Sequence, residues 1–130
     1  MGFPFEYKIV SALQNVTHMK VTKENSEEYS WGTNCFGWHL VNDRELSIIQ
    51  ELMPPNTAEV QHKHLKSQQF FYILKGEATF TIEGKTIIIK EHQGVHIPKK
   101  HIHQIKNNGN IDLEFLVISQ PHSHKDRITI

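Results

Sequence analysis

The stretch Val60–Phe80, VQHKHLKSQQFFYILKGEATF, places two histidines one residue apart and then runs into the most apolar segment of the 130-residue chain. Side chains alternate between the two faces of a β-strand, so an extended segment would present His62 and His64 on the same face. The run FFYIL is apolar at every position, which predicts a strand covered on both faces, by a barrel interior and by the N-terminal arm or a partner chain. The stretch therefore predicts two imidazoles beside a β-structured core.

The chain on either side of this stretch has the same texture from Cys35 onward. Short apolar runs of strand length alternate with turn residues; the runs are CFGWHLV, ELSIIQELM, VQHKH, QFFYILK, ATFTIEG, KTIIIKE, GVHIP, HIHQIK and DLEFLVIS. Runs rich in β-branched and aromatic residues at this spacing are typical of an all-β sandwich or barrel. The connection Glu83-Gly84-Lys85 predicts a hairpin that joins ATFTI to TIIIK.

The two ends of the chain have a different composition. Residues 1–35 are predicted to form an N-terminal arm, in which residues 20–30 are polar, lack periodicity and are expected to be a loop or surface arm. Residues 5–16 are compatible with a short helix or a strand. The barrel is expected over residues 36–120, and residues 121–130 are expected to be a tail that packs as an edge strand or stays loose.

The overall composition argues against several classes of partner. Lys and Arg number 14 and Asp and Glu number 14, so no basic surface predicts nucleic acid or an anionic membrane. No apolar run approaches the roughly 20 residues that span a bilayer. Cys35 is the single cysteine and is expected to be a small buried residue; with no disulfide possible and no secretory pattern at the start, a reducing cytoplasm is the expected location.

Two spaced motifs resemble those of the cupin superfamily, which are small jelly-roll barrels. The first family motif reads His-x-His, three or four residues, Glu, six residues, Gly; here His62-Lys63-His64 is followed at the matching distances by Gln69 and Gly76, with Gln in place of Glu. In the second motif the chain keeps Pro98, His103 and Asn107.

The second motif also departs from the family pattern, because Lys100 stands where Gly is usual and His92 stands where another Gly is expected. Together the two motifs and the strands around them cover roughly residues 46–119. The resemblance implies a double-stranded β-helix, the jelly-roll cupin barrel, preceded by the N-terminal arm.

Carried onto this chain, the resemblance implies a metal held by His62, His64, Gln69 and His103. Gln68 is the alternative fourth ligand, because a three-residue spacing after the second histidine also occurs. Three imidazoles and an amide oxygen suit a divalent transition metal such as Zn²⁺, Ni²⁺, Fe²⁺, Mn²⁺ or Cu²⁺. A ligand set without charge leaves the metal charge uncompensated, which strengthens it as a Lewis acid toward an anionic substrate.

Two further histidines lie near these motifs. His96 falls on the short run GVHIP and is a candidate acid or base at the barrel mouth, the alternative being a packed, hydrogen-bonded histidine. His101 shares its parity with His103, but it follows Pro98 in a turn and is expected at the rim.

Within the superfamily the chain resembles the single-domain cupins grouped as mannose-6-phosphate isomerase-like. The resemblance implies a small-molecule ligand, and we expect a metal-dependent protein acting on a small oxygen-rich metabolite, a sugar or a keto or hydroxy acid, by Lewis-acid isomerase or lyase chemistry. The alternatives are a redox-metal oxidase or dioxygenase and a non-catalytic module that binds a small ligand. A homodimer is expected from the apolar run FFYIL.

Overall fold

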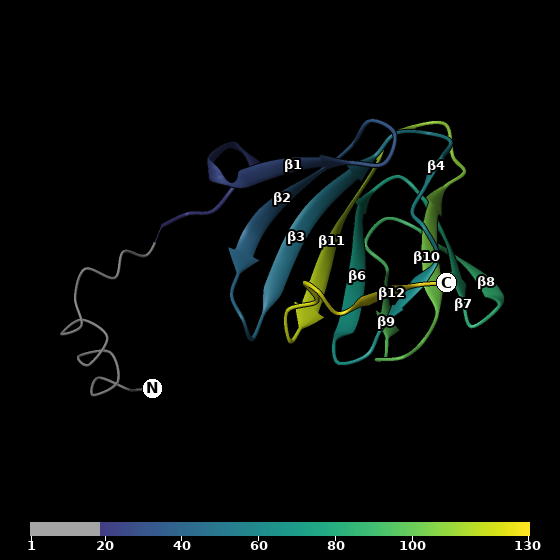
Figure 1. Ribbon diagram of the computed structural model, residues 1–130. Helices are drawn as coiled ribbons and strands as arrows, with labels where there is room; N and C mark the ends of the chain where they lie inside the picture. Colours follow the sequence, from purple (N-terminus) through teal and green to yellow (C-terminus); the bar gives the residue numbers. More distant parts are fainter. Residues whose placement is uncertain (1–18) are drawn as a thin grey trace, which may run out of the picture.

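The computed structural model describes residues 19–130, which form two antiparallel β-sheets that face each other (Figure 1). The helical content of this part of the chain is one short 3-10 turn, η1 (Lys23–Asn25). Within residues 19–130, no helix is long and apolar enough to cross a membrane. The expectation of an all-β jelly-roll fold is confirmed, whereas the alternatives for residues 5–16 lie outside the described residues.

Each sheet combines strands that are distant in the sequence. The first sheet has the order β1 (Glu27–Trp31), β2 (Cys35–Asn42), β3 (Ser47–Met53), β11 (Leu113–Gln120), β6 (Gln68–Lys75), β9 (Gly94–Ile97). The second has the order β12 (Arg127–Thr129), β5 (His62–His64), β10 (His103–Asn107), β7 (Ala78–Ile82), β8 (Lys85–Ile89), and β4 (Thr57–Ala58) also pairs with β10. Strands β1 and β12, near the two ends of the described chain, therefore lie at the edges of the two sheets.

Strand β1 differs from the expectation for the N-terminal arm. A loop or surface arm was expected over residues 20–30, and this is wrong from Glu27 on, because Glu27–Trp31 pairs residue by residue with β2. Tyr29 and Trp31 are half-buried and alternate with the exposed Glu28 and Ser30, and Trp31 packs against the core. Strands β1 and β2 form a hairpin, because Trp31 pairs with Cys35 and the turn residues Gly32 and Asn34 both have positive φ. Two aromatic residues in a short polar segment are too weak an alternation to predict this strand.

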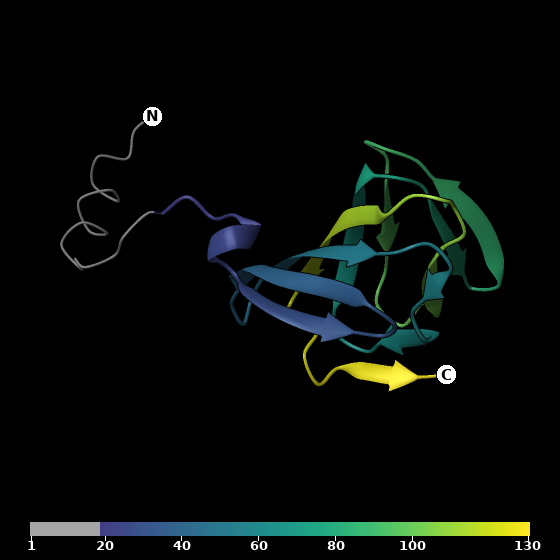
Figure 2. The same ribbon diagram turned by 90° about the horizontal axis from the view of Figure 1, so that it is seen from above.

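The C-terminal tail takes one of the two conformations that the sequence allowed. Residues Arg127–Thr129 form an edge strand that pairs with β5, with Arg127 opposite His64 and Thr129 opposite His62. In the view from above, this yellow strand lies along the edge of the molecule (Figure 2). The tail therefore covers the free edge of the strand that carries two of the expected metal ligands.

The hairpin between β7 and β8 has the expected turn. Ile82 pairs with Lys85, which leaves Glu83 and Gly84 as a two-residue turn, with φ of +49° and +80°. Positive φ at both turn residues matches the right-handed twist of the strands, and glycine adopts it at low cost.

The core between the sheets is apolar at one end and polar at the other. On β11 the inward residues Leu113, Phe115 and Val117 are buried, and the same face ends in Ser119. On β6 the inward sequence runs from Ile73 to Phe71 and then to Gln69, which is also buried. Because the strands are antiparallel neighbours, their polar ends meet, and a polar compartment forms at one end of an otherwise apolar barrel. Cys35 is fully buried, as expected.

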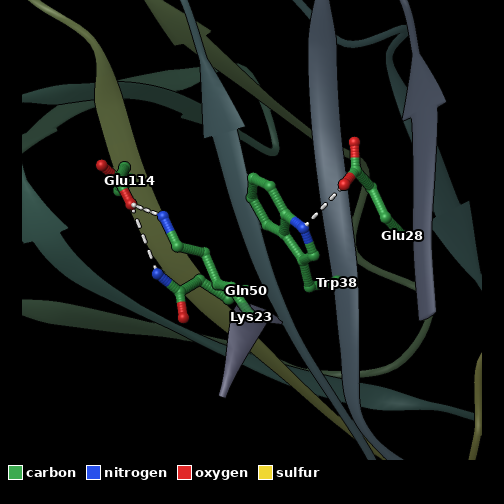
Figure 3. Close-up of polar contacts among 5 residues, drawn as sticks. All are labelled: Lys23, Glu28, Trp38, Gln50 and Glu114. Carbon is green, nitrogen blue, oxygen red and sulfur yellow. Dashed lines mark hydrogen bonds and ion pairs between the residues drawn. The ribbon is translucent and has the colours of Figure 1, made fainter. Parts of the chain in front are cut away.

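On the outer face of the first sheet, polar side chains attach the segment before β1 to the barrel (Figure 3). Glu114 of β11 accepts hydrogen bonds from Lys23 Nζ at 3.4 Å and from Gln50 Nε2 at 3.3 Å. Nearby, Trp38 Nε1 donates to Glu28 Oε1 at 3.2 Å. These contacts hold η1 and β1 against the sheet, and β1 supplies a residue to the site described below.

Candidate metal centre

Three buried histidines meet at the polar end of the barrel. His62 and His64 come from β5 and His103 from β10, and one nitrogen from each lies within 4.8 Å of the others. His62 and His103 are direct partners across the β5–β10 pair, and their ring centroids lie 4.4 Å apart. Strand alternation places His62 and His64 on one face, and sheet pairing brings the third imidazole to them.

Hydrogen bonds determine which ring nitrogen of two histidines is free. His62 Nδ1 lies 2.8 Å from the carbonyl oxygen of Val60, and His103 Nδ1 lies 2.9 Å from that of His101. A carbonyl oxygen only accepts, so each Nδ1 carries the proton and each Nε2 keeps its lone pair. Metal-binding histidines are usually oriented in this way by a backbone or carboxylate acceptor. His64 contributes a buried Nδ1 that has no hydrogen-bond partner among the described residues.

Gln69 completes the cluster from the other sheet. Its Nε2 donates to Ser119 Oγ at 3.0 Å, which leaves Oε1 facing His103 Nε2 at 3.1 Å. Because His103 Nδ1 carries the ring proton, two lone pairs meet at this contact. Each atom can therefore offer a lone pair to a cation beside it, as the other imidazoles of the cluster can. The donor set therefore fits a bound metal.

Burial keeps the imidazoles in the form that binds metals. Removal from water lowers the pKa of His62 to about 3 and that of His103 to about 4, and it also lowers the pKa of His64. All three rings are therefore neutral at neutral pH, and a neutral imidazole is a ligand without prior loss of a proton.

The structure separates the remaining sequence candidates from this cluster. Gln68 lies on the outer face of β6, where its Nε2 donates to Gln120 Oε1 at 3.0 Å. His96 lies on the same outer surface, with its Nε2 3.0 Å from Gln68 Oε1. The alternative ligand Gln68 and the candidate acid or base His96 thus contact each other outside the barrel. His101 is half-buried in the turn before β10, and its carbonyl group orients His103.

A cavity of about 170 Å³ adjoins His62, His64 and Gln69. It is also lined by polar groups that no sequence motif predicted as site residues. These groups are the side chains of Tyr29, Glu51, Glu59, Ser119, Ser123 and Arg127. Tyr29 and Arg127 belong to segments that were expected to be an arm and a tail. Only Glu51 among them could have been noticed in the sequence, because it is a charged residue at an inward position of β3, on the same face as Ile49 and Met53.

Tyr29 reaches this cavity across a neighbouring strand. Tyr29 of β1 is opposite Gly37 of β2, and Gly37 is opposite Glu51 of β3. The Tyr29 hydroxyl group donates a hydrogen bond to Glu51 Oε2. A Cβ atom at Gly37 would lie 2.3 Å from the tyrosine ring, so the absence of a side chain there lets the ring cross β2. Burial, together with the charge of Glu51, raises the pKa of Tyr29.

The two carboxyl groups of the cavity hold protons more tightly than usual. Burial raises the pKa of Glu51 to about 7, against the lowering effect of the Tyr29 hydrogen bond. Burial, followed by the charge of Glu51, raises the pKa of Glu59 to about 8, and the Arg127 guanidinium opposes both shifts. Glu59 Oε1 is buried and has no hydrogen-bond partner in the part of the chain that the structure describes. The cavity therefore joins a set of neutral metal ligands to two protonatable groups.

The fold and the three-histidine cluster together define a cupin. The cupin domain model matches residues 49–119, which is more than half of the chain, so the chain belongs to the cupin family. The family resemblance of the two sequence motifs is thereby confirmed.

Individual proteins of known sequence or structure are also similar to this chain. The chain is 38% identical over 66 residues to an oxalate-binding protein of Thermotoga maritima, covering 51% of this chain and 54% of that protein. It is 33% identical over 81 residues to an uncharacterised protein of Methanocaldococcus jannaschii, covering 62% and 65%. Both alignments span less than two thirds of the relative. A crystal structure of a predicted oxalate decarboxylase from Thermotoga maritima superposes with a TM-score of 0.72 and 28% identity, covering 80% of this chain and 100% of the other.

Proposed function

We propose that this cupin binds a divalent transition metal through His62, His64, His103 and Gln69 and acts on a small oxygen-rich metabolite by Lewis-acid isomerase or lyase chemistry. The observation that carries the proposal is the buried cluster of His62, His64 and His103, whose ligand nitrogens lie within 4.8 Å of one another. When bound, the metal would polarise a carbonyl or hydroxyl oxygen of the metabolite.

The composition of the donor set supports Lewis-acid chemistry over oxygenase chemistry. Three imidazoles and one amide oxygen differ from the two-histidine, one-carboxylate triad of non-haem iron oxygenases. A set of neutral donors also leaves the positive charge of the metal undiminished by its direct ligands. The carboxyl groups of this site stand apart from the four donors and remain available to a ligand.

The side chains of the chain itself would position the metabolite and exchange protons with it. Glu51, with a pKa of about 7, exists in both protonation states near neutral pH, as a general acid or base requires. Its hydrogen bond from Tyr29 fixes the carboxyl group in one orientation. The 170 Å³ cavity is small compared with the roughly 300–1,000 Å³ of sites for drug-sized ligands, which supports a small metabolite. The names of the oxalate-related relatives support the same size class.

Metal analysis of untagged protein by mass spectrometry tests the proposal directly. We expect near-stoichiometric metal in the wild type and its loss in His62→Ala and in His103→Ala. His96→Ala is the matched control, because its ring lies on the outer surface and bonds to Gln68. If the wild type stays empty after incubation with Zn²⁺, Ni²⁺, Mn²⁺ and anaerobic Fe²⁺, the proposal fails.

The homodimer expected from the sequence stays a prediction. The outward residue Phe70 of β6 is 39% exposed, so the described chain covers the outer face of the apolar run only in part. We propose this face as the dimer contact. Sedimentation equilibrium of the wild type and of Phe70→Glu tests it, and a wild type that remains a monomer at high concentration would reject it.

A further inference from the structure

Three polar side chains form one side of the cavity, and we call Tyr29, Glu51 and Glu59 the acid wall. They come from β1, from β3 and from the segment between β4 and β5, and all three line the cavity that His62 and Gln69 also line. The wall depends on a specific construction, because Tyr29 reaches Glu51 only across the bare backbone of Gly37. The residues that hold it together therefore span three adjacent strands.

One atom of the acid wall lacks a partner. Glu59 Oε1 is buried and has no hydrogen bond to any residue of 19–130, whereas Glu51 already accepts one from Tyr29. Buried polar groups in native proteins almost always have partners, and an unsatisfied one is costly. The group that satisfies a carboxylate oxygen must donate, and an alcohol hydroxyl donates while a fully ionised oxalate has only acceptors.

The charge of the acid wall also opposes that of the metal. Considered alone, the neutral ligand set would leave two positive charges on the metal and would favour an anionic ligand. Glu51 and Glu59 offset those two charges when both are ionised, above their raised pKa values of about 7 and about 8. Arg127 also lines the cavity, but its side chain is exposed and donates to the carbonyl oxygen of Val60 at 3.2 Å. A dianion entering the cavity would therefore meet two carboxylates.

From these observations we infer that the cavity takes a small uncharged ligand rich in hydroxyl groups, of the sugar or polyol class, whose hydroxyls donate to Glu51 and Glu59, and that the acid wall disfavours dianions such as oxalate. The inference rests on the proposed function and specifies its ligand class. It separates this chain from the relative that is named for oxalate binding.

The proton affinities of the acid wall agree with this selectivity. Glu51 and Glu59 have pKa values of about 7 and about 8, so both are ionised above pH 8. A dianion could then bind beside them only if protons were taken up to neutralise part of the negative charge. A hydroxyl group binds to a carboxyl group in either protonation state, since both states keep an acceptor oxygen.

Within the wall, burial raises the pKa of Tyr29 far above this range. The other titratable groups that line the cavity are His62, His64 and Arg127, and His39 lies against Tyr29 with ring centroids 5.0 Å apart. Burial lowers the pKa of His62 and of His64, and an arginine stays protonated.

Calorimetric titration of zinc-loaded protein at pH 8.5 tests the inference, with oxalate as the dianion and mannose, xylose and glycerol as hydroxyl probes. The variants are Glu51→Gln, Glu59→Gln and the pair together, because glutamine keeps the size and removes the charge. Glu45→Gln is the matched control, since Glu45 is exposed in the turn between β2 and β3. We expect oxalate to bind the double variant at least about tenfold more tightly than the wild type, because two repulsive charges are gone. We expect at least one hydroxyl probe to bind the wild type and to weaken about fivefold or more in Glu59→Gln, where an acceptor oxygen is lost.

The zinc content of each sample, measured before titration, distinguishes a failure of the proposed metal site from a failure of the inferred ligand class. A wild type that takes up neither zinc nor, in its place, Ni²⁺, Mn²⁺ or anaerobic Fe²⁺ overturns the proposed function. A wild type with zinc that binds oxalate as tightly as the double variant does, or that binds none of the hydroxyl probes, overturns the ligand class while the metal site stands. Glu45→Gln must behave as the wild type, because a shift there would trace the effect to net charge and would also overturn the acid wall.

Discussion

Gln69 Oε1 and His103 Nε2 face each other at 3.1 Å across the interior of the barrel. Gln69 belongs to β6 of the first sheet and His103 to β10 of the second, so the contact exists only when the two sheets have closed on each other. The Ser119 hydroxyl group orients the amide, and the His101 carbonyl group orients the ring. Ser119 lies on β11, which pairs with β6, and His101 lies in the turn before β10. Both orienting groups therefore belong to elements next to the candidate metal centre.

Replacing Gln69 by glutamate is expected to tighten metal binding. A carboxylate adds a negative charge next to the cation, and we expect the affinity for Zn²⁺ to rise by about tenfold or more. Competition with a chromophoric chelator at pH 7 measures the change. Gln68→Glu is the control, because Gln68 lies on the outer face of the same strand and is expected to leave the affinity unchanged. Equal effects of the two variants would contradict the placement of Gln69 at the metal.

Replacing Gly37 by alanine is expected to displace the Tyr29 ring. The new Cβ would lie 2.3 Å from the ring, so either the tyrosine or strand β1 must move. Overpacking of this kind costs about 1–3 kcal/mol, which urea denaturation of the variant would measure. Tyr29→Phe keeps the ring and loses the hydroxyl group, so a smaller loss there would assign the Gly37→Ala effect to packing. A Gly37→Ala protein as stable as the wild type would refute the crossing of β2 by Tyr29.

Asn107 is expected to stabilise the turn that follows β10. The residue is fully buried; its Nδ2 donates to the carbonyl oxygens of Met53 and Ile111, and its Oδ1 accepts from the Gly109 amide. Alanine at this position would leave these groups unsatisfied and is expected to lower the free energy of unfolding by about 1–3 kcal/mol. Thermal and urea unfolding would measure the loss. Asn110→Ala, at an exposed position of the same turn, should change stability by less than about 0.5 kcal/mol.

The stability of the metal-free protein is expected to fall as the pH rises from 6.5 to 8. Glu51 and Glu59 keep their protons to about pH 7 and about pH 8 in the folded state. An unfolded glutamate loses its proton near a pKa of about 4.3, so the folded state binds more protons across this window and loses that advantage as the pH rises.

Histidine acts in the opposite direction at lower pH. His62 and His103, with folded pKa values of about 3 and about 4, bind fewer protons than an unfolded histidine with a pKa of about 6.5, so they destabilise the fold as the pH falls below that value. Urea midpoints of metal-free protein at pH 6.5, 7.25 and 8 measure the sum of the two effects. The difference between the wild type and a variant without both glutamates isolates the glutamates, because the histidines are common to both proteins. The Glu51→Gln, Glu59→Gln double variant should show a flatter profile, and an unchanged slope would contradict the assignment.

The cluster of side chains that we propose as metal ligands could be predicted in part, because some of its residues carry local signals. His62 and His64 share a face through strand alternation, and the spacing of Gln69 and His103 follows from the motifs that resemble those of the cupins. The sequence left Gln68 and Gln69 open, since alternation along a strand gives no absolute face. The pairing of Gln69 with Ser119 and His103 placed it inside, while Gln68 turned outward toward His96.

By itself, the sequence determined that the chain forms a β-barrel of short strands with a hairpin at Glu83-Gly84 and a cluster of histidines at its wall, because these features depend on neighbouring residues and periodicity. Tertiary structure alone decided that Tyr29 and Arg127, from segments without periodic signals, line the same cavity as Glu51 and Glu59. The physical reason is that sheet pairing joins residues 60 to 72 positions apart, as in the pairs β3–β11 and β5–β12, through backbone hydrogen bonds that any side chain permits and no local pattern records.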